Sequence, residues 1–142
     1  MLVRLMYASR AAEGLKPDAV TAIARKSNAA NPARGITGVL CFSGAVFLQV
    51  LEGGRSQVSA LYNRIAADTR HRDVVLLSYE EIAERRFAGW AMGQVNMNTL
   101  NPALLLKYSE AAVLDPYAVS GSVSMALFTE LVATASIVCP GT

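Results

Sequence analysis

The stretch AVFLQVLE, residues 45–52, decides the fold. Its apolar residues predict a strand, and Ser43-Gly44 directly before it predicts a tight turn from another strand over residues 35–42. The two strands form a hairpin, and Gly53-Gly54 predicts a turn at its end. The remaining elements precede and follow this hairpin in the sequence.

The flanking segments alternate between strand and helix. The predicted elements are a strand over 3–9, a helix over 17–29, a helix over 56–68, and strands over 73–82 and 88–95. Asn31-Pro32 ends the first helix, because the residue before a proline disfavours the helical conformation, and Ser56 caps the second. This order predicts an α+β fold of the ferredoxin-like, split βαβ type, with a five-stranded sheet.

Two helices on one face of a sheet leave the other face bare. The sequence after residue 97 is apolar enough to cover it, in two predicted helices over residues 102–113 and 117–138. We therefore expect a domain over residues 1–97 and a helical extension over residues 98–142 that packs on the sheet.

Composition excludes several classes of protein. The 142 residues are 53% apolar and 17% charged, as in a globular domain, and a net charge of +2 is too small for a nucleic-acid footprint. Cys41, Cys139 and the single histidine, His71, favour free thiols in a reducing compartment over a zinc site. Without a signal peptide or a run of about 20 apolar residues, we expect a cytoplasmic protein that does not contact membranes.

Two polar side chains lie on strand faces that should be apolar. Gln49 shares its face with Phe47 and Leu51, and a buried amide must find hydrogen-bond partners. Tyr7 alternates with apolar residues of the first strand, so its hydroxyl points inward and needs a partner too. Strands one and three of a split βαβ are neighbours, so Tyr7 and Gln49 can meet. The alternative is a plain core in which each finds an ordinary partner.

Other candidate residues each have a structural and a functional interpretation. Asn31 suits the end of a helix, and it could also hold a polar ligand. Trp90 and Met92 share a face of the predicted last strand, where they could serve as core residues. The run over residues 68–72 is either a solvated turn or the contact of a polar or phosphate-bearing ligand.

Five separated segments match one known family. They are LMYAS at 5–9, Asn31 with GITG at 35–38, FLQVLEG at 47–53, DTRH at 68–71 and RFAGWAMG at 86–93. In this order and spacing, the sequence resembles the BLUF domains, which are flavin-binding sensors of blue light, over residues 1–97. The resemblance implies non-covalently bound FAD, with its ring between the two helices.

The resemblance also implies roles for individual residues. Tyr7 matches the residue that gives an electron and a proton to the photoexcited flavin, and Gln49 matches the amide that links this phenol to the ring. Trp90 and Met92 match the pair that passes the signal on. The implied flavin-binding residues are Tyr7, Ile23, Asn31, Phe47, Gln49, Arg64, Ile65, Asp68, Arg70 and His71.

The same resemblance sets the expected function and its rivals. The sequence has no GxGxxG motif and no nucleophile–base pair, so the flavin is expected to serve as a chromophore in a protein that is not an enzyme. Output would pass to an unidentified downstream protein or through self-association. An RNA-binding module would need a more basic sheet face. The main alternative is a flavin-free ferredoxin-like interaction module.

Overall fold

The central sheet of the protein is built around β1 and β3. The computed structural model describes residues 1–97, 100–134 and 137–138, so Cys139 lies outside the described residues. The elements are β1 (Leu2–Ala11), α1 (Pro17–Arg34), β2 (Thr37–Ser43), β3 (Val46–Gly54), α2 (Arg55–Ala67), β4 (His71–Ile82), β5 (Gly93–Val95), α3 (Pro102–Tyr108), α4 (Gly121–Thr134) and β6 (Ile137–Val138). The strand order is β4-β1-β3-β2-β5-β6, and only the β2–β5 pair is parallel among the described strands. The predicted α+β, split βαβ fold is confirmed.

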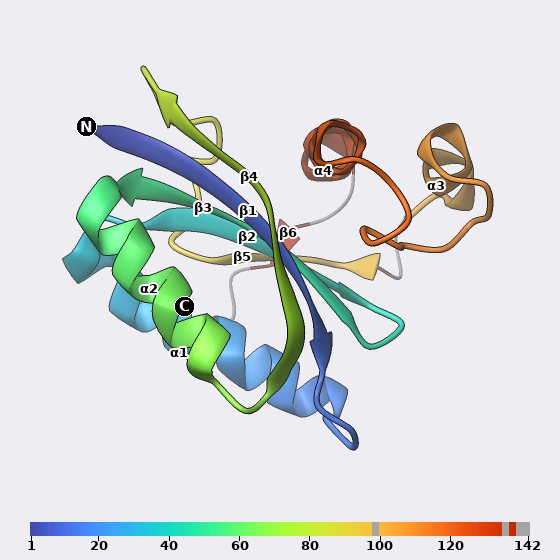
Figure 1. Ribbon diagram of the computed structural model, residues 1–142, viewed down its shortest axis with the longest axis horizontal. Helices are drawn as coiled ribbons and strands as arrows, with labels where there is room; N and C mark the ends of the chain where they lie inside the picture. Colours follow the sequence, from blue (N-terminus) through green and yellow to red (C-terminus); the bar gives the residue numbers. More distant parts are fainter. Residues whose placement is uncertain (98–99, 135–136, 139–142) are drawn as a thin grey trace.

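The sheet separates two hydrophobic cores. Helices α1 and α2 cover one face, and α3 and α4 lie on the other (Figure 1). Alternation along β1 sends Val3, Leu5 and Tyr7 to the α1/α2 core, which also holds Phe47, Leu51 and Met92. The tail core on the opposite face joins the sheet to the C-terminal helices through Met6, Ala8, Val39, Cys41, Leu48, Val50, Phe87, Val95, Leu105, Leu114, Leu127, Phe128 and Leu131.

Helix α1 continues past the point where the sequence predicted its end. Pro32 lies inside the helix, which runs to Arg34 and closes on Gly35 in the left-handed conformation. The amides of Gly35 and Ile36 donate to the carbonyls of Pro32 and Asn31, at 3.2 and 3.1 Å. These bonds stabilise the last turn and outweigh the local cost of the proline.

The segment before β5 also differs from the prediction. Only Gly93–Val95 forms a strand, and residues 83–92 have no regular structure, so Trp90 and Met92 do not lie on the last strand. The amide of Gly38 donates to the carbonyl of Trp90 at 3.0 Å, and Asn31 donates to the carbonyl of Ala91 at 2.7 Å. These contacts to other elements hold the backbone in place of a strand ladder.

Smaller corrections concern the ends of elements. Gly53 and Gly54 belong to β3 instead of forming a turn, and Gly54, not Ser56, occupies the N-cap of α2. The predicted helix over residues 117–138 begins only at Gly121, because Ser120 accepts a capping bond from the amide of Val123 at 3.2 Å. The helix predicted over 102–113 ends at residue 108, and residues 137–138 form a short strand beside β5. None of the described helices is both long and apolar enough to cross a membrane.

The tail core gives a first prediction. Phe128 is fully buried and meets Phe87 edge to face, with ring centroids 5.7 Å apart. Phe128→Ala should lower the free energy of unfolding by about 3–5 kcal/mol, as expected for an aromatic side chain removed from a packed core. Leu106→Ala, at a residue of the tail that is 55% exposed, should change it by no more than about 0.5 kcal/mol. Equal effects in chemical denaturation would show that α4 does not pack as described.

Candidate functional site

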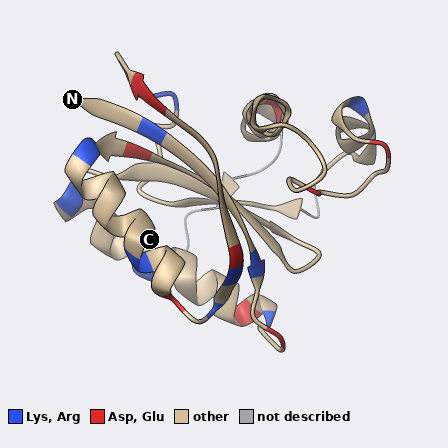
Figure 2. Ribbon diagram, in the orientation of Figure 1, with Lys and Arg blue, Asp and Glu red and all other residues tan. Residues whose placement is uncertain are grey.

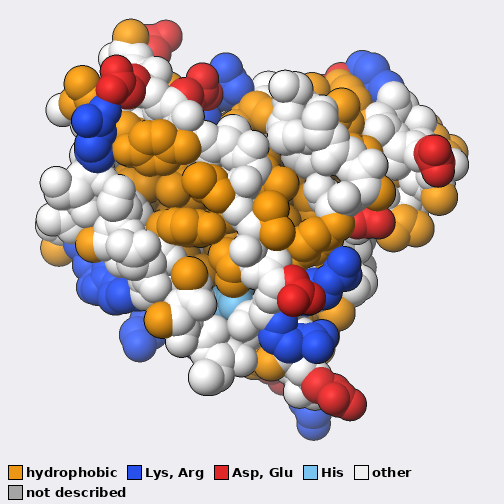
Figure 3. Space-filling view, in the orientation of Figure 1, with side chains coloured by type: hydrophobic (Ala, Val, Ile, Leu, Met, Phe, Trp, Pro, Cys, Tyr) orange, Lys and Arg blue, Asp and Glu red, His pale blue; other side chains and the backbone are white. Residues whose placement is uncertain are grey.

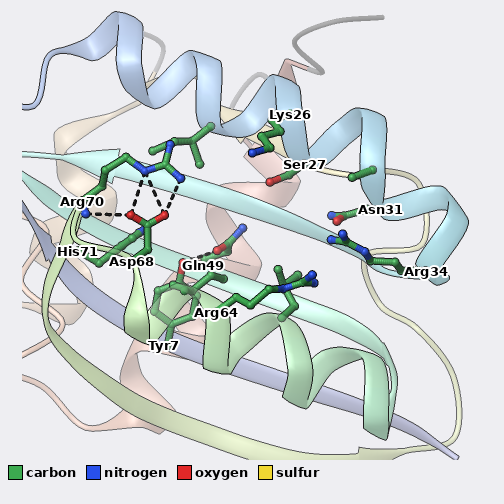
Figure 4. A pocket seen from close by; sticks show the side chains of 14 residues that line it. Tyr7, Lys26, Ser27, Asn31, Arg34, Gln49, Arg64, Asp68, Arg70 and His71 are labelled. Carbon is green, nitrogen blue, oxygen red and sulfur yellow. Dashed lines mark hydrogen bonds and ion pairs between the residues drawn. The ribbon is translucent and has the colours of Figure 1, made fainter.

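A cavity of about 280 Å³ opens between α1 and α2, above the centre of the sheet. Its volume lies near the lower end of the range for ligand pockets, roughly 300–1,000 Å³. Figure 4 shows side chains of the two helices facing one another across it, with Tyr7 and Gln49 between them. The lining residues are Tyr7, Ile23, Lys26, Ser27, Ala30, Asn31, Arg34, Gln49, Leu61, Arg64, Ile65, Asp68, Arg70 and His71.

Tyr7 and Gln49 form a hydrogen bond at the inner end of the cavity. They are opposite each other in the β1–β3 register, and both are at least 95% buried, with exposed fractions of 1% and 5%. The Tyr7 hydroxyl donates to Oε1 of Gln49, so the predicted meeting of the two side chains is confirmed. Burial, with smaller contributions from Tyr62 and Asp68, raises the pKa of Tyr7 far above its ordinary range, and the phenol keeps its proton.

The other end of the Gln49 amide contacts Met92. Nε2 of Gln49 donates to the sulfur of Met92 at 3.1 Å, and Met92 is fully buried in the α1/α2 core. Trp90 instead packs against the tail core on the opposite face. A thioether is a weak acceptor, so this end of the amide can exchange its partner for a better one at small cost.

The walls of the cavity are aliphatic and its inner rim is polar. Ile23 comes from α1, and Leu61 and Ile65 come from α2. Asn31 is 1% exposed, and its Nδ2 donates to Ala91 while keeping a second hydrogen that can serve a ligand. The cavity therefore presents apolar plates to the faces of a flat ring and amide groups to its edge.

His71 closes one side of the cavity. Its Nδ1 lies 2.7 Å from the Ser9 hydroxyl, and its ring lies 4.5 Å from the ring of Phe47, measured between centroids. Phe47 is itself fully buried behind His71 and does not line the cavity, although the sequence placed it there. The reason is that Phe47 lies two residues along β3 from Gln49, where the imidazole covers it.

Basic side chains surround the mouth of the cavity. Lys and Arg residues are spaced along α1 and α2 (Figure 2), and Lys26, Arg34 and Arg64 line the cavity. Arg70 is paired with Asp68 at 2.5 Å, and this hydrogen bond lowers the pKa of Asp68 to about 2. A rim with this excess of positive charge suits a ligand that carries phosphate. Within the described residues, no three His, Cys, Asp or Glu side chains come together as metal ligands.

Some lining residues were not foreseen from the sequence. Lys26, Ser27 and Arg34 lie on the face of α1 that also carries Ile23 and Asn31, at helical spacing. That spacing could have identified most of them. Arg34 was out of reach, because it lies beyond the predicted end of the helix. Leu61 lies one turn before Ile65 on α2 and was also not among the residues that the resemblance implied.

Comparisons with known proteins agree with this geometry. A family model described as BLUF, sensors of blue-light using FAD, matches residues 2–93. The photoactivated adenylate cyclase subunit beta of Euglena gracilis is 32% identical over 107 residues, which are 72% of this chain and 12% of that protein. The blue light- and temperature-regulated antirepressor BluF of Escherichia coli (strain K12) is 33% identical over 87 residues, which are 61% of this chain and 22% of that protein. The chain thus matches only a small part of these curated relatives.

Some solved structures match over nearly all of their length. The photo-activated state of BlsA has a TM-score of 0.82 at 29% identity, with 96% of this chain and 99% of BlsA covered. The dark state of BlrB, a BLUF protein, has a TM-score of 0.75 at 32% identity, with 93% of this chain and 95% of BlrB covered. The similarity therefore extends beyond β5 into the C-terminal helices.

The surroundings of His71 give a second prediction. Burial lowers the pKa of His71 and Arg70 adds to this, while Asp68 acts in the opposite direction. Because the sequence contains one histidine, its NMR titration is unambiguous. We expect a pKa below 6.5 in the folded protein. The unfolded chain then binds more protons below pH 6.5, so the free energy of unfolding should fall as the pH drops through this window. A measured pKa of 6.5 or higher would contradict the described environment.

Proposed function

The chain belongs to the BLUF family of blue-light sensors that use FAD, and from this premise we propose that light acts on the hydrogen bond between Tyr7 and Gln49. A flavin is its chromophore, and the chain is a sensor, not an enzyme. The observation that carries the proposal is the buried contact of a phenol and an amide in the wall of the cavity between α1 and α2.

The cavity suits the flavin that the family requires. We propose that Ile23 and Ile65 hold the two faces of the ring, and that Asn31 and Gln49 bind its polar edge. Asp68, Arg70 and His71 lie at another side of the cavity, where they would contact the ring or its ribityl chain, and Arg64 lies at the rim. Phe47 would support the ring only through His71. This arrangement supports FAD, whose phosphates would find basic side chains at the mouth.

Tyr7 is the proposed donor of the electron and the proton. When bound, a flavin absorbs blue light and becomes a strong acceptor of an electron. The phenol is protonated and buried, so losing an electron makes it release its proton, and the hydrogen bond to Oε1 of Gln49 provides the route. Tyr7 would give the electron to the flavin and, through the amide of Gln49, the proton, which would first move along the hydrogen bond already present in the structure.

Gln49 is the proposed switch. In the structure its Oε1 accepts from Tyr7 and its Nε2 donates to Met92. Rotation of the amide would exchange the two ends, and tautomerisation would exchange a donor for an acceptor without rotation. Either change alters the hydrogen bonds to the ring and the contact with Met92. The pocket then has two states, and light shifts the population between them.

The proposed output runs from Met92 to the other face of the sheet. Trp90 lies two residues before Met92 and packs against the tail core, so movement of Met92 can reach the C-terminal helices. We propose that residues 1–97 form the sensor and residues 98–142 transmit its state to an unidentified protein or to another copy of the chain. The E. coli relative is an antirepressor by name, which supports a protein partner. A free buried thiol at Cys41 suits the reducing cytoplasm as the location.

Absorption spectra before and after blue light test the proposal. The FAD-bound protein should show a flavin band that moves to slightly longer wavelength and recovers in the dark. Gln49→Leu and Tyr7→Phe should still bind FAD but lose this shift, because each removes one partner of the hydrogen bond. Gln57→Leu and Tyr79→Phe change exposed residues of the same types and should retain it.

Two results would overturn the proposal. Failure to bind FAD after reconstitution would favour a flavin-free module, and a full shift in Gln49→Leu would remove Gln49 from the mechanism.

A further inference from the structure

We propose that Glu52 and Arg85 are positioning residues that fasten the segment 83–92, so that the sulfur of Met92 is held at the amide of Gln49. The inference rests on the proposed function, because it assigns the parts of the chain that set the dark state of Gln49. Neither residue lines the cavity.

The segment 83–92 connects the two sides of the molecule. It leaves β4 at one edge of the sheet and must pass the ends of β1, β3 and β2 to reach β5 (Figure 1). Phe87 belongs to the tail core, and Met92 belongs to the α1/α2 core. A segment without regular structure needs other bonds to place a side chain accurately.

Glu52 supplies the first of these bonds. Its side chain is completely buried at the end of β3, and Arg4 Nε donates to Oε2 at 2.8 Å. The amide of Arg86 donates to Oε2 at 3.0 Å, and the amide of Phe87 donates to Oε1 at 2.6 Å. One buried carboxylate thus binds two successive backbone amides of the segment, and such charge-assisted bonds are stronger than neutral ones.

Arg85 supplies the second attachment. Its guanidinium donates to the carbonyl of Gly35 at 2.7 Å, to the hydroxyl of Thr37 at 3.0 Å and to the carbonyl of Glu52 at 3.4 Å. Gly35 closes α1, the helix that carries Asn31. Arg85 therefore joins the segment to the start of β2, to the end of β3 and to one helix of the cavity.

Residues 85–87, which make these attachments, precede Met92 in the same segment. Directly before Met92, the carbonyl of Ala91 accepts from Asn31, and the carbonyl of Trp90 accepts from the amide of Gly38. With residues 85, 86, 87, 90 and 91 all bound, Met92 has little freedom, and its sulfur stays at Nε2 of Gln49. In a looser segment, the sulfur of Met92 would lie at Nε2 of Gln49 for a smaller fraction of the time. Recovery of the dark state would then be slower.

Arg85→Gln and Glu52→Gln test the inference in two independent readouts. The first readout is the rate of dark recovery of the flavin band, which should fall at least about threefold in Arg85→Gln, since a typical hydrogen bond is worth a factor of this size. The effect should vanish when Arg85→Gln is combined with Met92→Leu, because the attachment acts through the sulfur. Glu84→Gln is the control, since Glu84 is an exposed neighbour with no partner among the described residues.

The second readout does not depend on the photocycle. In the dark, Glu52→Gln should speed hydrogen exchange at the amides of Arg86 and Phe87, and Arg85→Gln should shift or broaden the methyl NMR signal of Met92. Glu52→Gln keeps the side-chain shape but turns one acceptor into a donor that faces other donors. If this variant does not fold, Arg85→Gln carries the test alone.

The outcomes separate the two proposals. A wild-type protein that shows no light-induced shift contradicts the proposed function, while the Met92 signal still reports whether the segment is fastened. A normal wild-type shift with unchanged recovery and an unchanged Met92 signal in Arg85→Gln would overturn the inference. Effects of Arg85→Gln and Met92→Leu on recovery that simply add would also overturn it, because they would show a general structural role.

Discussion

A buried phenol and a buried amide must each find hydrogen-bond partners, and in this protein they find one another. The antiparallel register of β1 and β3 sets Tyr7 opposite Gln49 in the middle of the sheet. The hydrogen bond between them uses one end of the amide, and the other end contacts the thioether of Met92, which is a weak acceptor. A stable but easily rearranged group therefore lies in the wall of the cavity. The other residues of the site either enclose the amide of Gln49 or connect it to the rest of the chain.

The two faces of the sheet carry different features. Helices α1 and α2 provide an apolar cavity with polar groups at its inner end and basic groups at its mouth, which suits a flavin. The C-terminal helices cover the opposite face, where the side chains that alternate with Tyr7 and Gln49 are buried. The segment 83–92 contributes Phe87 to the tail core and Met92 to the α1/α2 core. Because Met92 of this segment contacts Gln49 and Phe87 lies in the tail core, we propose the segment as the route for a signal.

Much of this arrangement follows from the sequence. The alternation in β1 and β3 and the hairpin at Ser43-Gly44 predict the order of elements, and that order brings Tyr7 beside Gln49. In two of the failures, contacts between residues distant in sequence override local preference. Proline should end α1, but the turn at Gly35 and the bond from Asn31 to Ala91 keep it helical to Arg34. Residues 88–92 have the pattern of a strand. The carbonyls of Trp90 and Ala91 instead accept hydrogen bonds from Gly38 and Asn31. For the same reason the sequence could not place Met92 and Trp90 on opposite faces.

The central claim is that light changes the hydrogen bonds of Gln49 through Tyr7. The most direct test is a light-minus-dark infrared difference spectrum of the FAD-bound protein, recorded with unlabelled protein and with protein whose glutamine side chains carry ¹³C. The account predicts bands of a glutamine carbonyl and of a tyrosine ring that change on illumination, with the first moving to lower frequency in the labelled protein. A light-induced spectrum that contains flavin bands but none sensitive to the glutamine label would contradict the account.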